Sequence, residues 1–201
     1  RHDDFDLDVV RAVSAQVIRY VDKLGIKSAS TIVHGAGIGD FTPAEAAYAL
    51  TEGSMLGLYQ FGKYKSDSDS ENKFERLRII ELDGSKLGDL EQGVNKGTIT
   101  ASAVNYCRDM VNEPANVMTP TKMSECALEI AEAKDVSVTV HERSFMEDMG
   151  MGALLGVAQG SHELPKLIVL KYSPNPEDSS HIGLLGKGIT FDSGGLDLKS
   201  A

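Results

Sequence analysis

The stretch LLGKGITFDSGGLDLKSA, residues 184–201, gathers side chains whose types and spacing could do chemistry. Lys187 follows an apolar run, Asp192 lies five residues further on, and Lys199 twelve. Glycines beside these positions let the backbone turn sharply and leave space next to the side chains. In open α/β sheets, ligands bind beyond the carboxyl ends of strands, which is where this pattern places the amine of Lys187. The arrangement indicates a site without naming its reaction.

Two plainer interpretations compete with a site. A lysine at a strand end is commonly a solvated charge, and the aspartate of DSGG can form a turn by accepting backbone hydrogen bonds. The triplet GKG also suggests a phosphate loop, but Lys187 is followed by Gly188 where GxxxxGK[ST] needs Ser or Thr. From the residues alone, both the site and its chemistry stay open.

Composition narrows the class of protein. The chain has 201 residues, 41% of them hydrophobic, and a formal net charge of −10. Such an acidic chain disfavours nucleic acid as a partner, and no apolar run approaches the roughly 20 residues that span a bilayer. The N-terminus lacks the apolar region of a signal peptide, and Cys107 and Cys126 are far apart without a CxxC motif. We expect free thiols and a cytoplasmic location.

The elements that must position the site alternate between helix and strand. In the first half, periodicity predicts a helix over 7–24 that stops at Gly25, and a strand over 30–34. The segment TPAE, with Thr42 and Glu45, is a capping box that opens a helix to about residue 59. A strand over 76–82 and a helix over 86–111 follow. The glycines of GAGIGD (35–40) lack the GxGxxG spacing, so we expect an ordinary turn rather than a nucleotide site.

The second half repeats the alternation. Thr119 and Pro120 start a helix with Met123, Ala127 and Ile130 on one face, and SFME is a capping box based on Ser144. The strands expected here cover 136–140, 166–172 and 181–186. The predicted fold is α/β: a partial N-terminal α/β domain (1–84), a long linker helix (85–112), and the start of a catalytic α/β domain (113–201) with a mixed, partly parallel sheet.

The segment GKGITFDSGGLDLK resembles, almost letter for letter, the signature of the leucyl (cytosol) aminopeptidase family. Four further stretches are similar to that family in the expected order: EGSMLGLYQFGKYK (52–65), RDMVNEPANVMTP (108–120), MGMGALLGVAQGS (149–161) and LPKLIVLKY (164–172). The resemblance therefore covers nearly the whole chain. It implies a two-metal hydrolase that removes N-terminal residues from peptides, with Zn²⁺ or Mn²⁺ as cofactors, and a homo-oligomer, a hexamer in the family.

The resemblance also implies roles for the three residues. Lys187 binds one metal ion through its amine, Asp192 bridges both, and Lys199 is the catalytic residue that polarises the scissile carbonyl. These roles are chemically consistent. An amine coordinates only when deprotonated, and burial beside a divalent cation disfavours the ammonium form. Lys199 must stay protonated, because an oxyanion needs a cationic donor.

Other polar residues are given no role in the site. Asp197 is expected at the surface or behind the ligands. The histidines show no metal-ligand spacing, and we expect them in the surface or the core: His34, His141, His162 and His181.

The chain departs from the family in length. Family members are more than twice as long, and the remaining metal ligands and a catalytic arginine would follow Ala201. We therefore expect a fragment. Two protein ligands fall short of the about four of a typical zinc site, so we predict weak metal binding and no peptidase activity for these residues alone. Apolar edges near the C-terminal end predict association there. The alternatives are a non-catalytic scaffold built on the same family fold and, more remotely, a small-ligand module in the N-terminal half.

Overall fold

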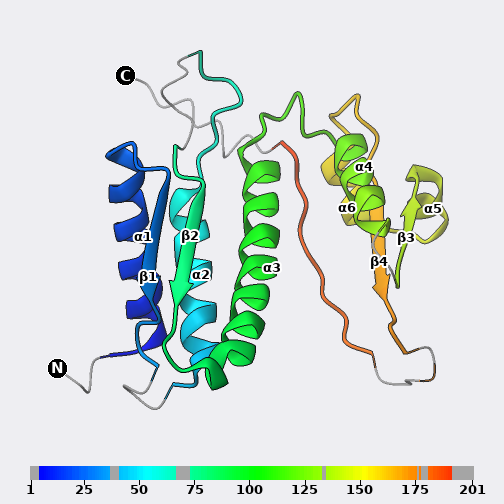
Figure 1. The fold of residues 1–201 in the computed structure, drawn as a ribbon. Coiled ribbons are helices and arrows are strands. Elements are labelled where there is room, and N and C mark those ends of the chain that lie inside the picture. The colour runs from blue at the N-terminus through cyan, green and yellow to red at the C-terminus, as the bar shows by residue number, and fades with distance from the viewer. Residues whose placement is uncertain are drawn as a thin grey trace. The chain divides into compact units, whose positions relative to one another are not determined.

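A computed structural model describes residues 5–36, 41–66, 73–132, 135–175, 177 and 181–191 (Figure 1). The chain forms two compact units, Arg1–Asn112 and Glu113–Ala201. Each unit combines helices with a two-stranded sheet, which confirms the α/β class. Within the described ranges, no helix is long and apolar enough to cross a membrane.

The first unit consists of three helices, a short 3-10 turn and one pair of strands. In chain order these are α1 (Leu7–Lys23), β1 (Ser28–Ile32), α2 (Pro43–Leu58), β2 (Arg76–Ile80), η3 (Gly84–Lys86) and α3 (Leu87–Asn112).

Helix starts in this unit follow local side-chain chemistry. The Asp6 carboxylate accepts a hydrogen bond from the Val9 backbone N–H at 2.8 Å and caps α1. At α2 the predicted capping box is confirmed: the Thr42 hydroxyl accepts from the Glu45 N–H, and the Glu45 carboxylate accepts from the Thr42 N–H. Both caps satisfy backbone donors that have no partner within the helix.

The strands β1 and β2 are parallel, with Ser28 opposite Arg76 and Ile32 opposite Ile80 (Figure 1). Strand β2 ends at Ile80, two residues before the predicted end. The Glu81 carboxylate accepts hydrogen bonds from the backbone N–H groups of Leu82 and Asp83, which turns the chain away from the sheet. Strand β1 starts and ends two residues earlier than predicted.

The core of this unit lies between the helices and the inner face of the sheet. Val10 of α1 packs with Leu50 of α2, and Leu77 and Ile79 of β2 contact them from the sheet. A second cluster joins α2 to α3 and contains Val33, Ala46, Ala47 and Leu90. Helix α2 is therefore central, with α1 on one flank and α3 on the other.

Glycines allow the helices to approach closely. A β-carbon on Gly53 or Gly57 of α2 would meet the backbone of α1 at Arg11 or Ala15. Likewise, a β-carbon on Gly93 of α3 would overlap the Ala44 carbonyl oxygen of α2, and one on Gly97 would lie 2.9 Å from the Tyr48 carbonyl oxygen. Helix α3 is thus packed along α2 within the first unit.

The C-terminal end of α3 is held to the end of α2 by polar contacts. The Tyr59 hydroxyl donates to the Asp109 carboxylate at 2.8 Å and accepts from the Asn112 side-chain amide at 3.0 Å. The Arg108 guanidinium lies over the Tyr59 ring, 5.2 Å from its centroid, and donates to the Leu56 carbonyl oxygen at 3.3 Å. Asp109 and Asn112 belong to the stretch RDMVNEPANVMTP, so this stretch begins with residues that anchor the helix end.

The second unit contains three helices and one pair of strands in its described part. These are α4 (Pro120–Ala131), β3 (Val136–His141), α5 (Arg143–Asp148), α6 (Gly152–Ala158) and β4 (Leu167–Tyr172). Thr119 caps α4 by accepting from the Lys122 N–H, and Pro120 follows as the first helical residue, as predicted. Helix α4 packs against both strands.

Two predictions for this unit need correction, the start of the helix after β3 and the strand over 181–186. Strands β3 and β4 are antiparallel, with Val136 opposite Tyr172, and they form the strand pair seen in the described part of this unit. Helix α5 starts after Glu142 with no side-chain cap, not after Ser144. The His141 ring stacks on Phe145 with centroids 3.9 Å apart, which places the first turn of α5 directly against the end of β3.

Residues 181–186 form no strand in the structure. A strand exists only through hydrogen bonds to a neighbour, and none of the described strands pairs with this segment.

Candidate functional site

Lys187 is the one predicted site residue within the described ranges. It lies in the extended segment 181–191, and its side chain is exposed. Among the described residues no carboxylate forms an ion pair with it. Asp192, Asp197 and Lys199 lie outside the described residues, so the structure tests neither their positions nor their distances from Lys187.

The segment before Lys187 is strongly apolar and strongly exposed. The relative exposures of Ile182, Leu184 and Leu185 are 92%, 93% and 101%. Burying a leucine or isoleucine side chain is worth about 1.5–3 kcal/mol, so exposure of three such residues is unfavourable. These three side chains form an exposed apolar stretch directly before Lys187.

One close contact ties this segment to the rest of the second unit. A β-carbon on Gly188 would lie 3.0 Å from the Met123 sulfur and 3.7 Å from its terminal methyl carbon. Met123 is half-buried on α4, and Cys126 and Ala127, one turn further on, are buried. The backbone directly after Lys187 therefore rests on a side chain of α4.

The neighbour of Met123 on α4 is charged. The Lys122 amine donates to the Glu125 carboxylate at 3.0 Å, and this hydrogen bond raises the pKa of Lys122 above its ordinary value. That amine is therefore a protonated partner of Glu125 and is not a candidate metal ligand.

Sequence reasoning missed the contact between α4 and residue 188. In the sequence, Met123 is one of three apolar residues on a helix face, and 64 positions separate it from Lys187. No local motif links the two positions. The glycine at 188 was a partial signal, because glycine is favoured where another group approaches the backbone closely.

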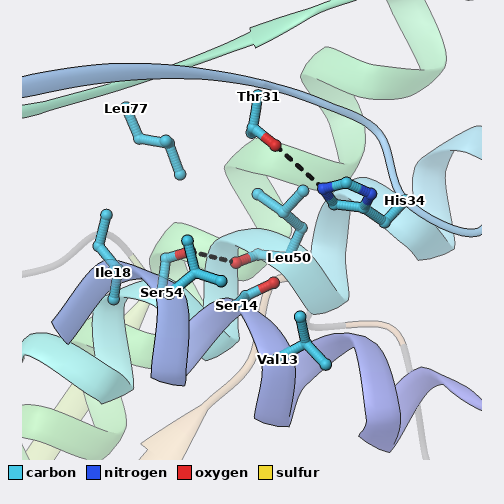
Figure 2. Close-up of a pocket in the computed structure, with 9 residues that line it drawn as sticks. Val13, Ser14, Ile18, Thr31, His34, Leu50, Ser54 and Leu77 are labelled. Atoms are coloured by element: carbon cyan, nitrogen blue, oxygen red, sulfur yellow. Dashed lines mark hydrogen bonds between the residues drawn. The ribbon is translucent and has the colours of Figure 1, made fainter. Parts of the chain in front are cut away.

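A small cavity of about 50 Å³ lies in the first unit, between α1, α2 and the sheet (Figure 2). Its walls are mainly apolar, with Val13, Ile18, Leu50 and Leu77 around it. Three of its polar side chains already bond within the unit: the Thr31 hydroxyl is 3.1 Å from the His34 ring, and the Ser54 hydroxyl donates to the Leu50 carbonyl oxygen at 2.8 Å. This volume suits one or two water molecules and gives no support to a small-ligand module.

The histidines are dispersed through the fold. His34 is exposed beside this cavity, and His141 stacks on Phe145. His162 and His181 are exposed. Within the described ranges, no three His, Cys, Asp or Glu side chains come together as a metal cluster.

In a comparison with protein families, both units match models of one family. Residues 1–68 match the cytosol aminopeptidase family, N-terminal domain, and residues 105–201 match the cytosol aminopeptidase family, catalytic domain. The two matches together cover most of the chain.

Individual relatives of the chain belong to the same family. The chain is 40% identical over 197 residues to a probable cytosol aminopeptidase of Alkaliphilus oremlandii. The aligned region covers 98% of this chain and 39% of that protein. It is also 38% identical over 198 residues to a probable cytosol aminopeptidase of Solibacter usitatus, and that alignment again covers 98% of this chain and 39% of the relative. The chain thus spans about two fifths of the length of these curated relatives.

Solved structures support the fold independently. A mutant of tomato leucine aminopeptidase superposes with a TM-score of 0.82 at 25% identity, covering 92% of this chain and 37% of that one. The bottromycin maturation enzyme BotP in complex with Mn gives a TM-score of 0.71 at 26% identity, covering 85% and 34%. Given the two family matches, the relatives and this shared fold, the chain belongs to the cytosol aminopeptidase family.

Proposed function

We propose that the full-length protein containing this chain is a metal-dependent aminopeptidase that hydrolyses the first peptide bond of peptides. The observation that carries the proposal is the match of both units, in order, to the two domains of the cytosol aminopeptidase family. The intact segment GKGITFDSGGLDLK adds three residues with suitable chemistry, Lys187, Asp192 and Lys199.

The donors in this segment fit divalent metal ions. Nitrogen and carboxylate oxygen are both accepted by Zn²⁺ and Mn²⁺, and a carboxylate can offer one oxygen to each of two ions. The Lys187 amine is exposed and has no ion-pair partner among the described carboxylates, so it is available for coordination. A neighbour of similar fold is described in complex with Mn. We propose two divalent ions held in part by Lys187 and Asp192.

A pair of divalent ions, when bound, supplies a water nucleophile at neutral pH. The residues of the chain have separate duties around it. Lys187 coordinates through the nitrogen lone pair and must be neutral to do so. Asp192 contributes negative charge that partly balances the two cations. Lys199 remains an ammonium group and donates to the oxygen of the scissile carbonyl as negative charge develops there.

We extend three further properties to the full-length protein as part of this proposal. Peptides with a free N-terminus are the substrates, the protein assembles as a homo-oligomer, and it works in the cytosol, which is the location named for its relatives. The family resemblance suggests a hexamer.

The test separates the two lysines in the full-length protein. Lys187→Met keeps an unbranched side chain but removes the amine, and we expect metal affinity to fall at least about tenfold in chelator competition. Lys199→Met should keep its metal, while kcat for release of leucine from a leucyl anilide falls about 100-fold or more, as when an oxyanion donor is removed.

Two results would contradict the proposal. Unchanged metal affinity in Lys187→Met would remove this residue from the metal site. A correctly folded, metal-loaded wild-type protein that releases no amino acid from any of a panel of peptides would favour the non-catalytic scaffold instead.

A further inference from the structure

Three glycines surround Lys187, and they differ in their environment. A β-carbon on Gly183 or Gly186 would meet no other described atom within 4 Å. A β-carbon on Gly188 would lie 3.0 Å from the sulfur of Met123. The contact is thus confined to the glycine that directly follows Lys187.

Met123 is itself held in place by the fold of the second unit. It lies in the first turn of α4, whose start is set by the Thr119 cap and by Pro120. Farther along this helix Cys126 and Ala127 are buried, and α4 packs on β3 and β4. The Met123 thioether therefore presents an anchored apolar surface to a segment that is otherwise exposed.

A metal ligand needs such an anchor. Functional groups must be held within about 0.5 Å of their working geometry, usually by packing of the residues around them. A lysine side chain has four rotatable methylene groups, so its amine can be positioned only if the backbone that carries it is fixed. Methionine suits this contact because its flexible, polarisable side chain adapts to an irregular surface.

We infer that Met123 is a positioning residue for Lys187: its thioether packs on the peptide at Gly188 and fixes the backbone from which the Lys187 amine reaches the metal. A β-carbon at position 188 would press on the Met123 sulfur, so a side chain there would disturb the contact. This inference rests on the proposed function, because it assigns Met123 a part in the same metal site.

The experiment uses the full-length protein and measures Zn²⁺ or Mn²⁺ affinity by competition with a chromophoric chelator. Met123→Ala should weaken metal binding about tenfold, the lower end of the effects seen when residues that orient ligands are changed. Met123→Leu nearly conserves the volume of the side chain and should stay within about threefold of wild type. The melting temperature of the metal-free protein is measured for each variant to show that the fold is kept.

Substitutions at position 188 test the contact between Met123 and Gly188 from the glycine side. Gly188→Val should weaken metal binding about as much as Met123→Ala, whereas Gly186→Val, on the opposite flank of Lys187, should have a much smaller effect. Met123→Ala and Gly188→Val disrupt the same contact, so their effects should not multiply. The loss of metal affinity in the double variant should be at least about threefold smaller than the product of the two single losses.

The outcomes separate this inference from the proposed function. If Lys187→Met loses metal affinity but the effects of Met123→Ala and Gly188→Val simply multiply, Met123 does not position Lys187 and the aminopeptidase proposal stands. If Met123→Leu binds metal as weakly as Met123→Ala, the packing volume of residue 123 does not determine metal affinity, and the inference is wrong. If Lys187→Met keeps its metal affinity, both proposals fail.

Discussion

At the scale of single residues, the side chain of Arg11 shows how charged groups join two helices of the first unit. Arg11 of α1 pairs with the largely buried carboxylate of Glu52 at 2.5 Å and with Asp8 at 2.8 Å, and its guanidinium lies 5.3 Å from the Tyr48 ring centroid. These contacts orient α1 on α2. They pair two carboxylates of the first unit, those of Asp8 and Glu52, with one guanidinium group.

Glu45 gives a prediction about pH. Hydrogen bonds from the Thr42 backbone N–H and from its hydroxyl hold the pKa of Glu45 below its ordinary value of 4.5. A carboxyl group whose pKa is lowered by folding contributes stability above its unfolded pKa and loses it as the pH falls through the folded pKa. Glu45→Gln should therefore melt below wild type at pH 7, and the difference should shrink as the pH falls below about 4.5.

The measurement is thermal unfolding of both proteins from pH 7 to pH 3. Glu91→Gln is the control, because Glu91 is exposed on α3 and forms no hydrogen bond with the described residues. A gap between Glu45→Gln and wild type that is constant over this range would show that the carboxylate charge at residue 45 does not stabilise the cap.

At the scale of elements, the first unit depends on how closely its helices approach. Gly93 and Gly97 of α3 face α2, and Gly53 and Gly57 of α2 face α1, so small residues occupy both helix contacts. Glycine weakens a helix by roughly 0.5–1 kcal/mol relative to alanine, and its presence here is explained by the backbone contacts that it permits.

Gly93→Ala tests this explanation. The new methyl group would overlap the Ala44 carbonyl oxygen and lie 2.9 Å from the Ala47 β-carbon, and a backbone oxygen within a helix cannot move aside cheaply. We expect a loss of about 1–3 kcal/mol, the range found for overpacked cores. Amide hydrogen exchange in α2 and α3 of the full-length protein would measure it.

Gly88→Ala is the matched control in the same helix, because a β-carbon at Gly88 meets nothing within 4 Å. Its exchange protection should be unchanged or slightly increased. Equal effects of the two substitutions would mean that helix propensity, and not close packing, decides the stability of α3.

At the scale of the whole molecule, the chain has two units, and it matches the N-terminal and catalytic domain models of one family. It spans about two fifths of its curated relatives, and the apolar residues Ile182, Leu184 and Leu185 are almost fully exposed. Within the described ranges no metal cluster is formed. Fold and family are thus shown for this chain, and the metal site and the reaction are proposed for the full-length protein.

This leads to a prediction about the isolated chain. Residues 1–201 alone should bind Zn²⁺ or Mn²⁺ weakly, because Lys187 and Asp192 provide two ligands against about four in a typical site. They should release no amino acid from a leucyl anilide. The full-length protein, assayed in parallel with added metal, is the positive control. Robust turnover by the purified 201-residue chain would overturn the prediction.

The sequence by itself determined the features that depend on neighbours along the chain. The capping box of Thr42 and Glu45, the Thr119 cap and the extents of α1 and α3 follow from interactions within one or two helical turns. The resemblance to the family is likewise readable from consecutive residues, in the motif GKGITFDSGGLDLK. Only the tertiary structure decided the antiparallel pairing of β3 with β4 and the contact of Met123 with Gly188. Each of these joins segments that are tens of residues apart, and which distant surfaces meet depends on the packing of the whole unit.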